Sequence, residues 1–216
     1  MTRVGALSVQ SDDRIKVMDE VATLVRSCGR CELCRGRTNA VPGHGDIHTE
    51  IMFIGEAPGQ NEDRQGLPFI GASGQFLNHL LASIELSRDD VFITNIVKCR
   101  PPGNRDPLPD EIAACGAYLD TQIDAINPLM IVTLGRFSMS KWFPNERISR
   151  IHGQSRIFGQ RVVVPMYHPA AALHQASLRS TIEADFERLP RILAQAREQL
   201  AAVVDAPDPA AQMKLF

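Results

Sequence analysis

Five cysteines carry the most evident chemistry in this chain of 216 residues. They are Cys28, Cys31, Cys34, Cys99 and Cys115, and the first three share the spacing C-x2-C-x2-C. Soft thiolates at that spacing suit zinc or an iron–sulfur cluster. Because the count is odd and the N-terminus shows no secretory signal, a disulfide framework is disfavoured. The sequence therefore predicts a metal site, with a set of reduced thiols as the alternative.

Polar residues that suit acid–base chemistry stand where apolar runs end. Four short apolar runs predict buried strands, at 51–55, 91–97, 130–135 and 161–166. Glu56 follows the first run, Asn95 lies near the end of the second, and His168 follows the fourth. In parallel sheets, ligands bind in the crevice outside the carboxyl ends of the strands. We therefore expect these three side chains to face one pocket.

The elements that must position these residues alternate along the chain. Helices are predicted at 15–26, 76–86, 110–126 and 182–203, with Asp110 as the N-cap of the third, and 55–74 is predicted as a long loop. Strands that alternate with helices predict an α/β fold, a three-layer α/β/α arrangement around a central four-stranded parallel sheet. We expect a single domain over 1–204 and a flexible C-terminal tail over 205–216, which contains two prolines.

The charge balance excludes one class of function and leaves others open. With 23 Lys and Arg against 25 Asp and Glu, the net charge is −2, so bulk positive charge cannot wrap this chain around nucleic acid. A content of 44% hydrophobic residues indicates a folded chain. No apolar run reaches the roughly 18 residues of a membrane span. We expect a cytoplasmic monomer without membrane contact.

Four segments, in order, carry a resemblance to a known family. They are GEAPGQNED (55–63), GLPFIGASG (66–74), TNIVKCRPP (94–102) and MYHPA (166–170). With the cysteines, they resemble the motifs of family 4, the iron–sulfur uracil-DNA glycosylases, over about residues 27–193. The resemblance implies hydrolysis of the N-glycosidic bond of uracil in DNA, which leaves an abasic site. It also implies a four-stranded parallel sheet and a [4Fe–4S] cluster.

The resemblance and the chemistry together assign roles at the pocket. A flipped uracil needs an aromatic face, which Phe69 can supply, with a core position as the alternative. Asn95 can accept from uracil N3–H and donate to O4. Bond cleavage leaves negative charge on uracil O2, where a donor such as His168 lowers the barrier. A nearby carboxylate can orient the attacking water and stabilise the sugar cation, and Glu56 is assigned to the pocket as a candidate for this role.

Three neighbouring residues complete this pocket. Backbone around Ala57 is expected to meet uracil, and Ala57 stands where other superfamily members carry a catalytic Asp. That leaves the group that activates water open among Glu56, Glu62 and Asp63. Glu62 is assigned to the C5 side of the base, where it would help to exclude the methyl group of thymine. The alternative for Glu62 and Asp63 is a solvated acidic turn.

The resemblance also selects the metal ligands. The family's cysteine pair precedes an Arg-Thr dipeptide, matched here by residues 37–38, so the cluster is assigned to Cys28, Cys31, Cys99 and Cys115. Cys31 and Cys34 have the same spacing, so that register stays open on the sequence alone. Zinc on the same four thiols is the alternative metal.

Contacts to DNA are expected from loops. Residues 136–161 contain six Lys and Arg against one acid, and Arg136, Arg150 and Arg156 are predicted to bind phosphates. A merely solvated face is the alternative. Leu173 is predicted to fill the gap that the flipped base leaves. One branch of the superfamily that the chain resembles stays covalently attached to its abasic product through a His in a basic loop after the third cluster cysteine. The loop after Cys99 has neither feature, so the resemblance implies turnover rather than a covalent product complex.

Two other functions compete with a uracil-excising hydrolase. One is a cluster-bearing module that binds damaged DNA without cutting it, and the other is a small-molecule hydrolase on the same sheet. The tail adds a possible partner, because its end, Gln212–Phe216, resembles the peptide that binds bacterial sliding clamps. The alternative for this peptide is contact with the protein's own surface.

Overall fold

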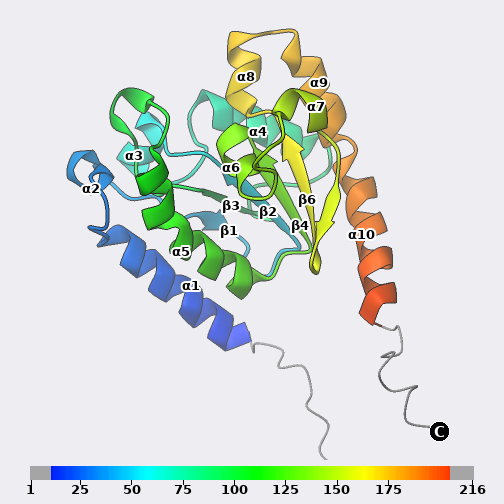
Figure 1. Ribbon diagram of the computed structural model, residues 1–216, viewed down its shortest axis with the longest axis horizontal. Helices are drawn as coiled ribbons and strands as arrows, with labels where there is room; N and C mark the ends of the chain where they lie inside the picture. Colours follow the sequence, from blue (N-terminus) through cyan, green and yellow to red (C-terminus); the bar gives the residue numbers. More distant parts are fainter. Residues whose placement is uncertain (1–10, 205–216) are drawn as a thin grey trace, which may run out of the picture.

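The computed structural model describes residues 11–204, which form a six-stranded sheet in the order β1-β3-β2-β4-β6-β5 (Figure 1). The strands are β1 (His44–Gly45), β2 (Ile51–Gly55), β3 (Phe92–Asn95), β4 (Met130–Leu134), β5 (Arg156–Phe158) and β6 (Arg161–Met166). The inner strands β3, β2, β4 and β6 are parallel, and the edge strands β1 and β5 are antiparallel. The α/β class is confirmed, but the sheet has six strands rather than four. The two edge strands are too short and too polar to form an apolar run.

Helices pack on both faces of this sheet. They are α1 (Ser11–Arg26), α2 (Leu33–Gly36), α3 (Gln60–Gln65), α4 (Ala72–Ala82), α5 (Pro109–Ile126), α6 (Arg136–Ser140), α7 (Ile148–Ile151), α8 (Pro169–His174), α9 (Leu178–Phe186) and α10 (Leu189–Val204), with a 3-10 turn at Pro102–Asn104. Phe53 of β2 faces the cluster that α4, α9 and α10 complete. Its neighbours Met52 and Ile54 face the cluster completed by α1, α5, α6 and α7. This alternation along one strand produces the three layers.

Two predictions about helices were wrong, one about the number of helices and one about an N-cap. The segment predicted as one helix over 182–203 is two helices, α9 and α10, separated by Glu187 and Arg188. Pro190 fits the first turn of α10, where a missing N–H costs nothing. Asp110 is not the N-cap of α5, because Leu108 takes that position. The Glu111 carboxylate accepts a hydrogen bond from the Leu108 backbone N–H at 2.7 Å.

The predicted loop over 55–74 is only partly irregular. It contains helix α3, which ends at Gly66 in the left-handed conformation (φ 73°), and its last residues begin α4. The six-residue α3 is too short to show a helical period in the sequence. Because of α3, Glu62 and Asp63 lie on a helix and not on a turn.

Some predictions fall outside these elements. Among residues 11–204, no helix combines the length and apolarity that crossing a membrane requires. The predicted tail, with the Gln212–Phe216 peptide, lies outside the described residues. The single-domain boundary at 204 stays a prediction.

Candidate active site

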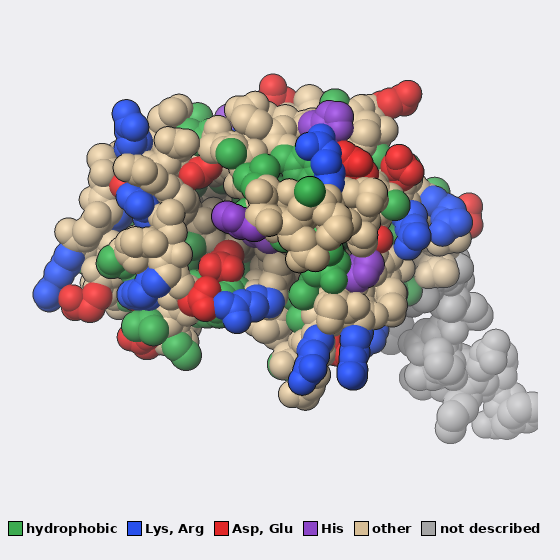
Figure 2. All heavy atoms as spheres, turned by 90° about the horizontal axis from the view of Figure 1, so that it is seen from above, with side chains coloured by type: hydrophobic (Ala, Val, Ile, Leu, Met, Phe, Trp, Pro, Cys, Tyr) green, Lys and Arg blue, Asp and Glu red, His purple; other side chains and the backbone are tan. Residues whose placement is uncertain are grey.

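A cavity of about 330 Å³ opens at the carboxyl ends of β2, β3 and β6. All of the residues predicted to form the base pocket line it: Glu56, Ala57, Glu62, Phe69, Asn95 and His168. Figure 2 looks onto this end of the molecule and shows a hollow bordered by acidic, basic and histidine side chains. The prediction that strand ends bring these residues together therefore agrees with the geometry, while their roles remain to be tested.

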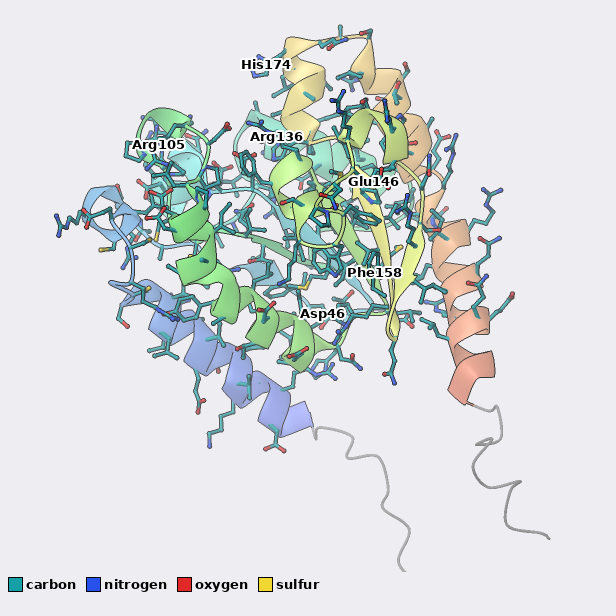
Figure 3. All side chains as sticks on the ribbon, in the orientation of Figure 1. Asp46, Arg105, Arg136, Glu146, Phe158 and His174 are labelled. Carbon is teal, nitrogen blue, oxygen red and sulfur yellow. The ribbon has the colours of Figure 1, made fainter. Side chains whose placement is uncertain are left out.

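Other residues that line the cavity were not predicted from the sequence. Arg105 enters from the loop before α5, and His174 lies at the end of α8 on another side (Figure 3). Ser73 lies in the first turn of α4. The sequence contained a signal for Arg105. Its loop follows the strand that ends at Asn95, so it leaves the sheet at the edge where the cavity lies.

Asn95 presents an unsatisfied acceptor at the cavity. It is the last residue of β3, it is 1% exposed, and its Oδ1 has no hydrogen-bond partner among the described residues. The sheet register places Gly55 beside it. A Cβ on Gly55 would lie 2.4 Å from Asn95 Oδ1 and 2.5 Å from Phe69 Cζ. Glycine at this position thus lets the amide and the ring approach one another, and the buried Oδ1 is available to a donor on a ligand.

A buried lysine fixes the backbone of Asn95 from behind. Lys98 Nζ donates to the Asn95 carbonyl oxygen at 2.9 Å, to Thr94 Oγ1 at 2.6 Å and to Gln122 Oε1 at 2.7 Å. Burial lowers the pKa of Lys98 to about 7. These bonds tie the end of β3 to α5, so the direction of the Asn95 side chain is set by the surrounding structure.

His168 is held neutral with a defined tautomer. Burial lowers its pKa to about 4, although the nearby Glu62 carboxylate opposes the shift. The Ala170 backbone N–H donates to His168 Nδ1 at 3.1 Å. A neutral imidazole that accepts at Nδ1 carries its proton at Nε2. His168 therefore offers a single donor to a ligand without bringing a positive charge into the cavity.

Phe69 and Glu62 form the loop side of the cavity. The Phe69 ring stacks on the His168 ring with centroids 5.5 Å apart and an interplanar angle of 26°. Glu62 is 7% exposed, and its Oε1 accepts from the backbone N–H groups of Ile70 at 2.8 Å and Gly71 at 2.7 Å. The alternative of a solvated acidic turn is therefore wrong. Phe69 belongs both to the apolar core and to the cavity wall.

The two other candidate carboxylates differ in their surroundings. Glu56 lines the cavity, and its pKa is raised by burial and by the Asp106 carboxylate, while the Arg136 guanidinium opposes the shift. Asp63 is buried and accepts from the Thr38 backbone N–H at 2.9 Å, outside the residues that line the cavity. Glu56 can therefore act on a ligand. Asp63 instead holds α3 against the backbone at Thr38, after the first three cysteines.

Four thiols from three parts of the chain gather beside the ends of α1 and β3. Cys28 and Cys31 follow α1, Cys99 follows β3, and Cys115 lies on α5. Burial raises the pKa of Cys115, and the thiolates of Cys28 and Cys31 raise it further. Burial also raises the pKa of Cys99 to about 11, with further contributions from Cys115 and Cys31. Cys34 contributes to the raised pKa of Cys31 but not to those of Cys99 or Cys115.

The thiols are not closely clustered in the described part of the chain. Within residues 11–204, no group of three or more His, Cys, Asp or Glu side chains is arranged to hold a metal ion. A tetrahedral zinc, with Zn–S bonds of about 2.3 Å, would bring its sulfurs to within about 4 Å of one another. A four-iron cluster is larger and holds its four thiolates further apart. Four buried or half-buried cysteines are a donor set that fits a four-iron cluster, and the same four thiols can also bind zinc.

The predicted phosphate-binding arginines are mostly paired with acids. Arg136 forms an ion pair with Asp106, and Arg156 bonds to Glu146 at 3.1 Å. Arg150 is exposed and forms no ion pair with the rest of the described chain. Leu173 is 51% exposed on α8, next to the cavity residue His174. The basic stretch is thus partly neutralised, which its residue count could not reveal.

The fold is thus a mostly parallel α/β sheet with a cavity lined by polar side chains at its strand ends. The chain belongs to the uracil-DNA glycosylase superfamily, whose family model matches residues 42–193. It is 50% identical to a type-4 uracil-DNA glycosylase of Saccharolobus solfataricus, over 82% of this chain and 86% of the relative. Identity to the type-4 enzyme of Archaeoglobus fulgidus is 46%, over 80% and 91%. A type-5 enzyme of Thermus thermophilus is 36% identical over 51% and 58%.

Proposed function

We propose that this protein excises uracil from DNA by hydrolysis of the N-glycosidic bond, which leaves an abasic site. The observation that carries the proposal is the cavity that brings Glu56, Asn95 and His168 together at one edge of the sheet. The relatives at 46% and 50% identity bear the name type-4 uracil-DNA glycosylase, which supports this activity. A glycosylase must extrude its target base, and the cavity provides a place for one.

Recognition of uracil follows from the polar groups of the cavity. Asn95 Oδ1 accepts from uracil N3–H, and the Asn95 amide donates to O4. Cytosine has the opposite pattern and would leave both groups unpaired. The base stacks on Phe69, the backbone around Ala57 meets its edge, and Glu62 lies at the C5 side. Because Glu62 Oε1 already holds two backbone N–H groups, this carboxylate is fixed and cannot move away from a methyl group.

Cleavage is helped by groups that act on developing charge. As the bond breaks, negative charge grows on uracil O2 and positive charge grows on the sugar. The Nε2–H of His168 donates to O2, and this bond strengthens only as the charge develops. Glu56, when ionised, orients the attacking water and stabilises the sugar cation. A neutral His168 suits this role. A partly buried imidazolium would already attract uracil O2 in the ground state, before the bond breaks.

We further propose that Cys28, Cys31, Cys99 and Cys115 hold a [4Fe–4S] cluster. The cluster supplies a structural link between the segment after α1, the end of β3 and helix α5. We expect substitution of any of these four residues by Ala to remove the visible absorption of the purified protein and to weaken folding. Cys34→Ala is the matched control and should keep the absorption. Loss of absorption in Cys34→Ala, with retention in Cys28→Ala, would show that the register is wrong; zinc without iron in elemental analysis would exclude the cluster.

DNA binding is proposed to involve the rim of the cavity. Arg150 is available to a phosphate, whereas Arg136 and Arg156 must exchange Asp106 and Glu146 for phosphate oxygens. Leu173 is exposed beside the cavity and can enter the space that the flipped base leaves in the duplex. A clamp-binding tail, a monomeric state and a cytoplasmic location stay predictions.

One experiment distinguishes excision from binding alone. The protein is incubated with matched oligonucleotides that carry uracil, thymine or cytosine at one position, and the products are treated with hot alkali. Scission only at uracil, and its loss in His168→Ala, is the result expected. Retention of the uracil oligonucleotide in a shift assay without scission would favour a damage-binding module. Absence of both binding and scission would leave a small-molecule hydrolase.

A further inference from the structure

The loop that carries Phe69 has an unfavourable backbone. Residues 68–71, here called the Phe69 loop, contain Phe69 at φ 51°, a left-handed conformation that bulky side chains rarely adopt. A Cβ on Gly74 would lie 1.9 Å from the Phe69 carbonyl oxygen, so the first turn of α4 closes tightly on this loop. Strained conformations of this kind persist only where surrounding contacts hold them.

A residue far along the chain provides those contacts on one side. Arg88, between α4 and β3, donates through Nη2 to the Pro68 carbonyl oxygen at 2.6 Å and through Nη1 to the Phe69 carbonyl oxygen at 2.5 Å. The guanidinium is a rigid planar fork, which suits two acceptors in fixed positions. Arg88 Nη1 is also 3.4 Å from Asn78 Oδ1 on α4, which orients it.

Glu62 provides the contacts on the other side. Its carboxylate accepts from the N–H groups of Ile70 and Gly71, the two residues after Phe69. The carbonyl groups of Pro68 and Phe69 thus point to a cation, and the N–H groups of the next two residues point to an anion. Charge-assisted hydrogen bonds of this kind are roughly twice as strong as neutral ones. The Phe69 loop is therefore held from both sides by opposite charges.

We propose that Arg88 is a positioning residue that sets the plane of the Phe69 ring for stacking with the extruded base. Arg88 is not among the residues that line the cavity, so it acts through the loop and not by touching the base. The ring plane matters because Phe69 lines the cavity together with Asn95 and His168, and its plane is 26° from that of the His168 ring. The proposal rests on the proposed function, since it concerns the stacking of that same base.

The test is a double-mutant cycle between Arg88→Met and Phe69→Ala, measured as single-turnover excision over a range of enzyme concentrations. Because stacking on an aromatic ring favours occupancy of the cavity by the base, each single variant should raise the half-saturating concentration about tenfold or more. If Arg88 acts through the ring, the double variant should be no worse than Phe69→Ala alone. Arg88→Lys, which keeps the charge but loses the fork, should recover part of the loss. The exposed Arg64→Met is the control and should match the parent protein.

A purely structural role for Arg88 predicts other results. The two effects would then multiply, and the melting temperature of Arg88→Met would fall in step with its activity. The proposal would be overturned if the effects of the two substitutions on the half-saturating concentration multiply in the double variant. It would also be overturned if Arg88→Met has the same half-saturating concentration as the parent protein. If Arg88→Met does not fold, the cycle is run with Arg88→Lys, and additivity there has the same meaning. A parent protein without any excision would instead count against the proposed function.

Discussion

The cavity has two walls that are held in different ways. The strand wall consists of Glu56, Asn95 and His168, which lie at the ends of β2, β3 and β6. Its geometry comes from the backbone ladder of the sheet, with Lys98 as a brace. The loop wall consists of Phe69 and Glu62 and depends on side-chain bonds to a strained loop. The strand wall is therefore held mainly by the backbone of the sheet, whereas the loop wall depends on side-chain hydrogen bonds.

This difference suggests a division of work between the walls. Two groups on the strand wall, Glu56 and His168, act where charge develops, so their loss should lower the rate of bond cleavage. The loop wall meets the face and the C5 edge of the base, so its loss should weaken occupancy of the cavity. Variants on each wall can therefore be separated by comparing the maximal single-turnover rate with the half-saturating concentration.

The largest effect is expected on the strand wall. His168→Ala should lower the maximal rate of uracil excision by ~10²–10³, because one donor to a developing oxyanion is worth that much. Affinity for uracil-containing DNA should change little, since the lost bond strengthens only during cleavage. Single-turnover kinetics and a binding titration with the same oligonucleotide measure both quantities. A near-parental rate would remove His168 from the catalytic set, and a large loss of affinity would contradict the division between the walls.

His168 should also make the free energy of unfolding depend on pH. The folded pKa of His168 is about 4 and its ordinary value is 6.5, so the unfolded chain binds more protons between these values. The free energy of unfolding should therefore fall as the pH drops from 6.5 to 4, by up to about 3 kcal/mol from this group. Denaturant titrations of the parent protein and of His168→Gln across that range give the contribution as a difference. Parallel curves for the two proteins would show that His168 is not held neutral.

One substitution should disturb both walls together. Gly55→Ala places a Cβ 2.4 Å from Asn95 Oδ1 and 2.5 Å from Phe69 Cζ, so both side chains must move. Overpacking of this kind costs about 1–3 kcal/mol, and we expect both a lower maximal rate and a higher half-saturating concentration. Gly116→Ala is the control, because a Cβ there meets no atom within 4 Å. A change in only one of the two kinetic quantities would show that the walls do not meet at Gly55.

The two walls also differ in how far the sequence predicts them. The apolar runs predicted the strand wall, because Glu56, Asn95 and His168 lie near their carboxyl ends and parallel strands all end at one edge of a sheet. Phe69 and Glu62 came from the family resemblance, since a loop between elements has no period to follow. Arg88 was not predicted, because a contact to backbone carbonyls across about twenty residues leaves no pattern in the sequence. Likewise, the pairing of Arg136 with Asp106 depends on the course of a loop that residue counts do not determine.

The smallest effect concerns the acid limb of the pH–rate profile, which tests Glu56 on the strand wall. If Glu56 must be ionised, the rate should fall as the pH drops through its raised pKa. Asp106 helps to raise that pKa and Arg136 opposes it, so their removal should move the limb in opposite directions. Asp106→Asn should shift it to lower pH, and Arg136→Gln should shift it to higher pH.

Both shifts should be less than about one pH unit, because Asp106 and Arg136 are largely exposed and solvent screens their charges. The opposite signs are the decisive part of this test. Loss of DNA contacts by Arg136→Gln would weaken binding, but it would not move the limb of the maximal rate. Equal shifts in one direction, or no shift in either variant, would mean that the limb reports another group and that Glu56 is not the carboxylate that acts on the water.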